Sequence, residues 1–348
     1  MKIKHYFGLA VIAAMTASCS SNEDLGTAGP GTGTNEAGVG YATFTINLPS
    51  TNGTRADNPT YEQGTLDEYD VNDVTLLIFK KAGKSEDEYT FVEKADLGNM
   101  APWKAEGANG ITASATITAK LSSVALTSEG SKSDYYALAI LNNNADEHGE
   151  GGKVKLPTTG TYSTWNDASN TDVAKFTVNT NGFYMANAPV FVAGGEPTTL
   201  VNIDKVYATK QKAETNAATT IHVERGLAKV SIASNAFPST ALKPTGTKYN
   251  KDEVKITAWN LDVTNKSTFP IHKTAGLKNT NFSTIWSNTA STTGASVTRF
   301  VDGSNPSFKR VHWGIDPNYS DDLTTVAACE GAFNILPANG KIDGAADK

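Results

Sequence analysis

The stretch Tyr41-Ala-Thr-Phe-Thr-Ile-Asn-Leu-Pro49 gives the clearest indication of how this chain folds. Polar and apolar side chains alternate along it, and the apolar face carries Ala42, Phe44, Ile46 and Leu48. A period of two is typical of a β-strand with one buried face, because successive side chains of a strand point to opposite sides. Pro49 ends the pattern, since proline has no backbone N–H to donate to a sheet.

A polar tether joins this strand to the rest of the chain. It runs from Ser50 to Thr54 and ends at Arg55, a residue that a trypsin-like protease recognises, followed by Ala56. A strand that packs its apolar face into a β-domain and hangs on a cleavable tether can be removed, and its groove must then be refilled. This predicts donor-strand assembly, in which an extended segment of a neighbouring subunit completes the sheet. The alternative is an ordinary first strand followed by a surface arginine.

The composition indicates a mostly β chain and argues against one class of partner. The 348 residues include 36 acidic and 30 basic side chains, so there is no basic excess to bind the phosphates of a nucleic acid. Threonine, serine, asparagine and glycine are abundant, which favours short strands joined by polar turns. A chain of this length is predicted to form about two domains once a leader is removed.

The N-terminus has the pattern of a secretory leader. Positive charge in Met1–Lys4 precedes a short apolar run, Tyr6–Met15, that is too short to span a bilayer as a stable helix. The small residues that follow resemble a bacterial lipoprotein signal, so residues 1–18 are expected to be removed and Cys19 to be acylated. Thr16 departs from that signal, which usually has leucine there, and a plain leader cut nearby is the alternative.

A spacer and several strands are expected after the leader. Residues 19–40 are rich in glycine and are interpreted as a flexible linker. Asp73–Lys80 is apolar on both faces from Leu76 to Phe79 and is therefore expected at the centre of a sheet, whereas Ile111–Leu121 alternates without a break. The polar stretch Lys205–Ala218 is interpreted as a connection between domains. Further strands are expected at Tyr135–Leu141, Ile221–Ala233 and Val254–Val263.

These patterns predict an all-β, or mostly β, fold class with two tandem β-sandwich domains of the transthyretin-like type. The first spans residues 41–218 and the second residues 219–348. The chain stops at Lys348 in a polar stretch without a closing strand, so the second sandwich is expected to be incomplete.

The sequence does not favour an enzyme. Its five histidines are scattered, and it contains no HExxH motif and no Gly-x-Ser-x-Gly elbow. We expect no catalytic residue, no metal and no cofactor. Asn142–Gly152 lacks the spacing of a calcium loop and is interpreted as a solvated turn. His222, Glu224 and Arg225 are interpreted as strand surface with a structural ion pair.

The five tryptophans keep a second function open. If they lined one face they would suit a surface glycan-binding lipoprotein, and otherwise they are aromatic core. They are Trp103, Trp165, Trp259, Trp286 and Trp313.

Several motifs, taken in order, resemble the fimbrillin family of type V pili, nearest to its minor-fimbrium shaft subunits. Each motif is short, and their order along most of the chain is what makes the resemblance specific. After the lipoprotein leader they are Thr54-Arg55-Ala56, Val74–Phe79, Tyr136–Asn142, Val223–Val230 and Ile256–Trp259.

The resemblance implies a route of export and maturation. The precursor would be a lipoprotein, palmitoylated at Cys19 and held on the cell outer membrane by its lipid. An Arg-specific surface protease would cut between Arg55 and Ala56, so residues 41–55 would end the propeptide. The removable strand would carry Phe44, Ile46 and Leu48.

The resemblance also implies a partner. The C-terminal strand of the next fimbrillin subunit would fill the vacated groove, so that subunits join head to tail into an extracellular fimbrium, or pilus, for cell adhesion and biofilm formation. A tip or anchor subunit is an alternative to the shaft subunit. Members of the family continue well past the region of Leu336, so either this sequence is truncated or it cannot donate a strand in the usual way.

Overall fold

A computed structural model describes most of the chain from Val39 to Leu336. The described residues are 39–48, 66–98, 103, 114–145, 151–168, 171–177, 182–189, 198–228, 230, 248, 251–253, 259–274 and 314–336. The predicted lipidation site at Cys19 and the predicted cleavage point at Arg55 and Ala56 lie outside them.

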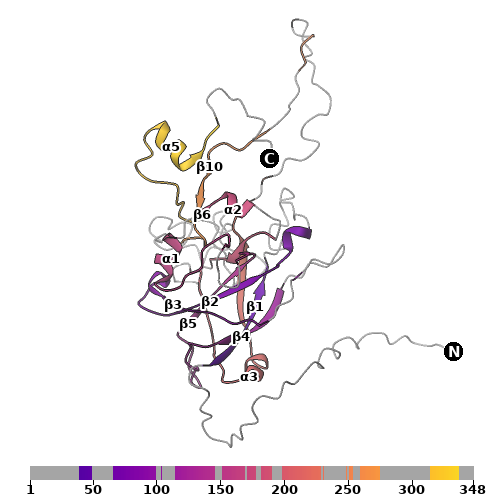
Figure 1. Ribbon diagram of the computed structural model, residues 1–348, viewed down its shortest axis with the longest axis vertical. Helices are drawn as coiled ribbons and strands as arrows, with labels where there is room; N and C mark the ends of the chain where they lie inside the picture. Colours follow the sequence, from indigo (N-terminus) through magenta and orange to yellow (C-terminus); the bar gives the residue numbers. More distant parts are fainter. Residues whose placement is uncertain are drawn as a thin grey trace, which may run out of the picture. The chain divides into compact units, whose positions relative to one another are not determined.

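The dominant element is one curled, mixed β-sheet of eight strands (Figure 1). Its order is β3-β2-β5-β7-β9-β1-β4, and β8 pairs with the same edge of β5 as β7 does. The strands are β1 (Gly40–Asn47), β2 (Val74–Lys80), β3 (Thr90–Lys94), β4 (Ser114–Leu121), β5 (Tyr135–Leu141), β7 (Met185–Asn187), β8 (Val201–Asn202) and β9 (Thr219–Arg225). The prediction of a mostly β chain is therefore confirmed.

Short helices and two-stranded pairs complete the described structure. The helices are η1 (Leu66–Tyr69), η2 (Glu86–Glu88), α1 (Tyr162–Ala168), α2 (Ala174–Thr177), α3 (Lys210–Glu214) and α5 (Val326–Ala332). The small pairs join β10 (Thr264–Asn265) to β12 (Phe333–Asn334) and β11 (Ser267–Thr268) to β6 (Thr171–Asp172).

The two outer strands of the sheet meet each other. Asp96, just after β3, and Lys120 of β4 exchange two backbone hydrogen bonds of 3.1 and 2.9 Å. The Glu93 carboxylate of β3 accepts hydrogen bonds of 3.0 Å from the backbone N–H groups of Ser122 and Ser123, which follow β4. The sheet is thus closed at one point into a ring of strands.

Apolar side chains pack on both faces of the sheet. In β2, Leu76 and Ile78 belong to the cluster on one face, and Leu77 and Phe79 belong to the cluster on the other. All four are buried, which confirms the expectation that this strand is central. The first cluster also contains residues from β1, β4, β5 and β9, whereas the second packs against α1 and α2.

The expected border between two sandwiches coincides with a strand of this one sheet. β9 begins at Thr219, the first residue of the predicted second domain, and lies between β7 and β1. Its neighbour in the sequence, α3, occupies part of the stretch interpreted as a connection, and Ala213 of α3 is buried. The division into two transthyretin-like sandwiches remains a prediction.

Two local expectations are wrong. Residues 259–263 of the expected strand Val254–Val263 are irregular, and Trp259, Leu261 and Val263 are exposed. The start of the loop Asn142–Gly152 is buried rather than solvated, because Asn142 and Asn143 are 0% exposed. The Asn142 side chain bonds to the backbone of Asn72, Asp70 and Phe183, so it joins three segments.

The Asn187 side chain bonds to the backbone of β5 between the residues that pair with β7 and those that pair with β8. Its Oδ1 accepts from the N–H of Ala139 at 2.9 Å. Its Nδ2 donates to the carbonyls of Ala137 and Thr199 at 3.0 and 2.9 Å. The side chain is buried, so no water is at hand to replace these bonds.

Asn187→Ala should therefore lower the free energy of unfolding by about 3 kcal/mol, because it removes three hydrogen bonds to buried backbone groups. Urea denaturation measures the loss. Asn216→Ala is the matched control, since Asn216 also donates to a carbonyl, that of Lys212, but is exposed to water. Equal losses of unfolding free energy in the two variants would contradict this role of the Asn187 side chain.

Glu86 joins η2 to the segment before β8. Its carboxylate accepts from the N–H of Thr199 at 2.8 Å and from that of Leu200 at 2.8 Å. Burial raises the pKa of Glu86 to about 7, although these N–H groups oppose the rise by favouring the charged form.

The stability of the protein should fall as the pH rises through the range in which Glu86 titrates. The folded chain keeps a proton on Glu86 up to about pH 7, whereas the unfolded chain releases it near pH 4.5. The stabilisation is full below pH 4.5 and is lost, by up to about 3 kcal/mol, as the pH rises to 7. Denaturation midpoints of wild type and Glu86→Gln, measured across this range, should diverge, and parallel curves would refute the prediction.

Candidate functional site

The candidate site is the space that β1 fills between β4 and β9, named here the β1 slot. β1 pairs antiparallel with β4 along its whole length, from Gly40 opposite Leu121 to Asn47 opposite Ser114. On its other edge it pairs in parallel with β9, from Phe44 opposite Thr219. β1 is therefore an inner strand of the sheet, joined on both edges to strands distant from it in the sequence.

The apolar face of β1 is buried as its alternation predicts. Ala42, Phe44 and Ile46 are each 1% exposed and Leu48 is 5% exposed, and all four belong to the first core cluster. Burying a side chain of this size is worth roughly 1.5–3 kcal/mol. The three residues predicted to hold the removable strand, Phe44, Ile46 and Leu48, thus form part of the central core.

The other face of β1 carries a pair of threonines that bond to threonines of β4. The hydroxyl groups of Thr43 and Thr118 are 3.0 Å apart, and those of Thr45 and Thr116 are 3.2 Å apart. Such directly opposed threonines stabilise an antiparallel pair. Both stretches show threonine at alternate positions in the sequence, a signal that the prediction of these strands did not include.

The start of β1 has a third neighbour. Tyr41 and Tyr207 exchange two backbone hydrogen bonds of 2.8 Å, on the edge of β1 that pairs further along with β9. The β1 slot is therefore bounded at this end by the segment that leads into α3.

The first described element after β1, η1, is bonded to the sheet. η1 follows the tether, and the Arg225 side chain of β9 donates to the Glu68 carbonyl of η1 at 3.2 Å. Arg225 also forms an ion pair of 3.7 Å with the Glu68 carboxylate and lies 4.8 Å above the ring of Tyr69. These contacts hold η1 to β9 and do not involve β1.

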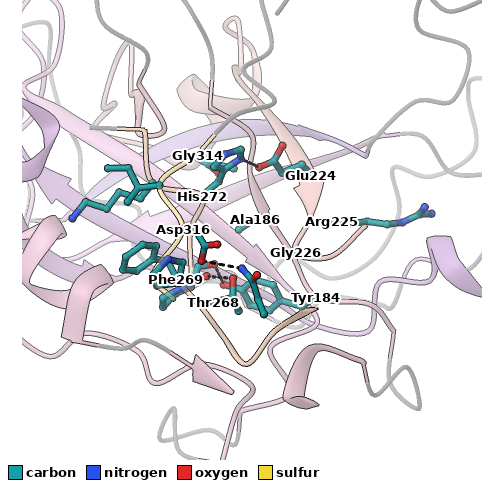
Figure 2. A pocket seen from close by; sticks show the side chains of 16 residues that line it. Tyr184, Ala186, Glu224, Arg225, Gly226, Thr268, Phe269, His272, Gly314 and Asp316 are labelled. Carbon is teal, nitrogen blue, oxygen red and sulfur yellow. Dashed lines mark hydrogen bonds and ion pairs between the residues drawn. The ribbon is translucent and has the colours of Figure 1, made fainter. Parts of the chain in front are cut away.

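A separate pocket of about 300 Å³ lies between the β7–β9 region and residues 265–273 and 314–317 (Figure 2). Its polar groups are largely bonded to one another. The Glu224 carboxylate accepts a hydrogen bond from Nδ1 of His272 at 2.8 Å, and the Tyr184 hydroxyl donates to the Pro270 carbonyl at 2.9 Å. Arg225 points away from the other labelled side chains. These contacts attach residues 265–273 to the sheet.

Glu224 and Arg225, interpreted as strand surface with a structural ion pair, each form an ion pair with a residue distant in the sequence. Glu224 pairs with His272, and Arg225 pairs with Glu68. Two of the five tryptophans, Trp103 and Trp165, are buried in the two core clusters, whereas Trp259 is exposed. Trp286 and Trp313 lie outside the described residues.

Within the described ranges, no group of three histidine, cysteine or carboxylate side chains is placed to hold a metal ion. Among the same residues, no helix has the length and apolar character needed to cross a membrane. Comparison of the chain with protein-family models, with curated proteins and with solved structures found no match.

Phe44→Ala should destabilise the protein by about 3–5 kcal/mol, because it leaves a cavity in the centre of the first core cluster. Thr45→Ala, at the neighbouring position on the opposite face, should lose about 1 kcal/mol. Urea denaturation of both variants checks the difference. If the two losses were alike, the β1 slot would not depend on its apolar face.

Proposed function

We propose that this protein is a structural subunit of a surface fimbria, a pilus shaft subunit that polymerises by donor-strand exchange. The observation that carries the proposal is the position of β1. The first strand of the described structure fills an inner place of the sheet, yet it is joined to η1 only through residues 48–65. A cut within those residues would separate β1 from the rest of the sheet without a break in any other strand.

In the precursor, β1 fills the β1 slot of its own chain. Its connection to η1 keeps β1 at an effective concentration of the order of millimolar, so the closed state is favoured over exchange with other chains. The export part of the proposal places lipid on Cys19 and the precursor on the outer membrane.

Proteolysis after Arg55 changes this balance. β1 becomes part of a separate peptide, and its binding then depends on the concentration of that peptide instead of on a covalent link. The contacts between Arg225 and η1 keep the remaining chain attached to the sheet at Glu68. The contact of Asp96 with Lys120 keeps β4 attached to β3, so both walls of the β1 slot are retained.

An extended segment of a neighbouring subunit would then enter the β1 slot. It would regain the backbone hydrogen bonds of β4 and β9 and place alternate apolar side chains where Phe44 and Ile46 lay. Repetition of this step gives a head-to-tail extracellular polymer, which would support adhesion and biofilm formation.

Arg55→Ala should block both cleavage and polymerisation. The expected result is a full-length, lipid-anchored precursor that gives no SDS-resistant ladder in unboiled samples after treatment with an Arg-specific protease, whereas wild type gives the ladder and a new N-terminus at Ala56. Arg55→Lys, treated with a protease that also cuts after lysine, should restore the ladder. Normal fibres from Arg55→Ala would refute the proposal, and a cut monomer that binds glycans without polymerising would favour a binding lipoprotein.

A further inference from the structure

Gly40, the first residue of β1, lies where the β1 slot has no room for a side chain. A Cβ atom at this position would be 2.4 Å from Cγ1 of Val206, and 3.4 Å from side-chain atoms of Leu126 and of Val124. Real Cβ atoms essentially never approach another heavy atom to within 3.0 Å. Glycine is therefore required here by the lack of space.

The wall that Gly40 meets is fixed in place. Val206 is 2% exposed and belongs to the first core cluster. Its N–H donates to the Thr127 hydroxyl at 2.9 Å, and its carbonyl accepts from the Thr127 N–H at 3.1 Å. The N–H and the carbonyl of the next residue, Tyr207, are both hydrogen-bonded to the backbone of Tyr41. Movement of Val206 away from β1 would break these contacts.

The β1 slot widens along the apolar face of the strand. Ala42, two residues after Gly40, lies opposite Ala119 of β4, and both are almost fully buried. Phe44 and Ile46 then occupy places that hold large side chains. The face therefore has no room for a side chain at Gly40, and then holds a methyl group and two large apolar groups. A strand shifted by two residues would place a Cβ at the glycine position.

We infer that the β1 slot selects the strand that replaces β1 by this taper, and that the glycine position sets its register. The partner is an extended segment of a neighbouring subunit with glycine, a small residue two positions later, and large apolar residues four and six positions later. This inference rests on the proposed function, because it assumes that β1 is exchanged.

The test uses the full-length protein cut after Arg55 and fluorescent synthetic peptides with the sequence of Val39–Leu48. The unchanged peptide should enter the β1 slot and co-migrate with the protein on gel filtration. The Gly40→Val peptide should bind about tenfold or more weakly, as overpacking of a close-packed site requires. The matched control is Tyr41→Val, which changes the adjacent residue on the opposite face and should bind within a few-fold of the unchanged peptide.

The outcomes separate this inference from the proposed function. Equal binding of the unchanged and the Gly40→Val peptides would overturn the inference alone, because exchange would occur without selection at Gly40. Failure of the unchanged peptide to enter the cut protein would overturn the proposed function and this inference with it. A second measurement uses the uncut protein, in which Gly40→Val should lower the urea midpoint more than Tyr41→Val does. Equal midpoints would show that Val206 moves to accommodate the side chain, and would overturn the inference.

Discussion

The pairing of β1 with β4 and β9 is the interaction on which the rest of the structure depends. Without β1, the strand order would be interrupted between β9 and β4, and the first core cluster would lose Phe44 and Ile46. No other described strand joins those two neighbours. Burial on one face and threonine hydroxyl contacts on the other fix the register of β1, since a shift of one residue would exchange the two faces.

The two strands beside β1 are also held by contacts that do not involve β1. β4 is joined to β3 through the backbone of Asp96 and through the Glu93 carboxylate, and β9 is joined to β7 and to η1. Both neighbours of β1 therefore have a second attachment. In an open-ended sheet of the same order, β4 would be attached through β1 alone.

In this fold, several buried backbone groups are hydrogen-bonded by side-chain amides or carboxylates instead of by a neighbouring strand. Asn187 spans the gap between β7 and β8, Asn142 joins three segments, and Glu86 holds the segment before β8. Each is buried, so each bond replaces one that water cannot supply. Asn187 is the last residue of β7, Asn142 directly follows β5, and Glu86 lies in η2.

The sequence by itself determined the strand character of β1, β2 and β4, because a period of two and runs of apolar residues are local properties that a strand needs. It also determined which face of β1 is buried. Tertiary structure alone decided that β9 lies beside β1 in parallel, that Arg225 pairs with Glu68, and that Val206 closes the β1 slot at Gly40. These contacts join segments far apart in the chain, and only packing of the complete sheet decides which strands become neighbours, since many pairings satisfy the same local pattern.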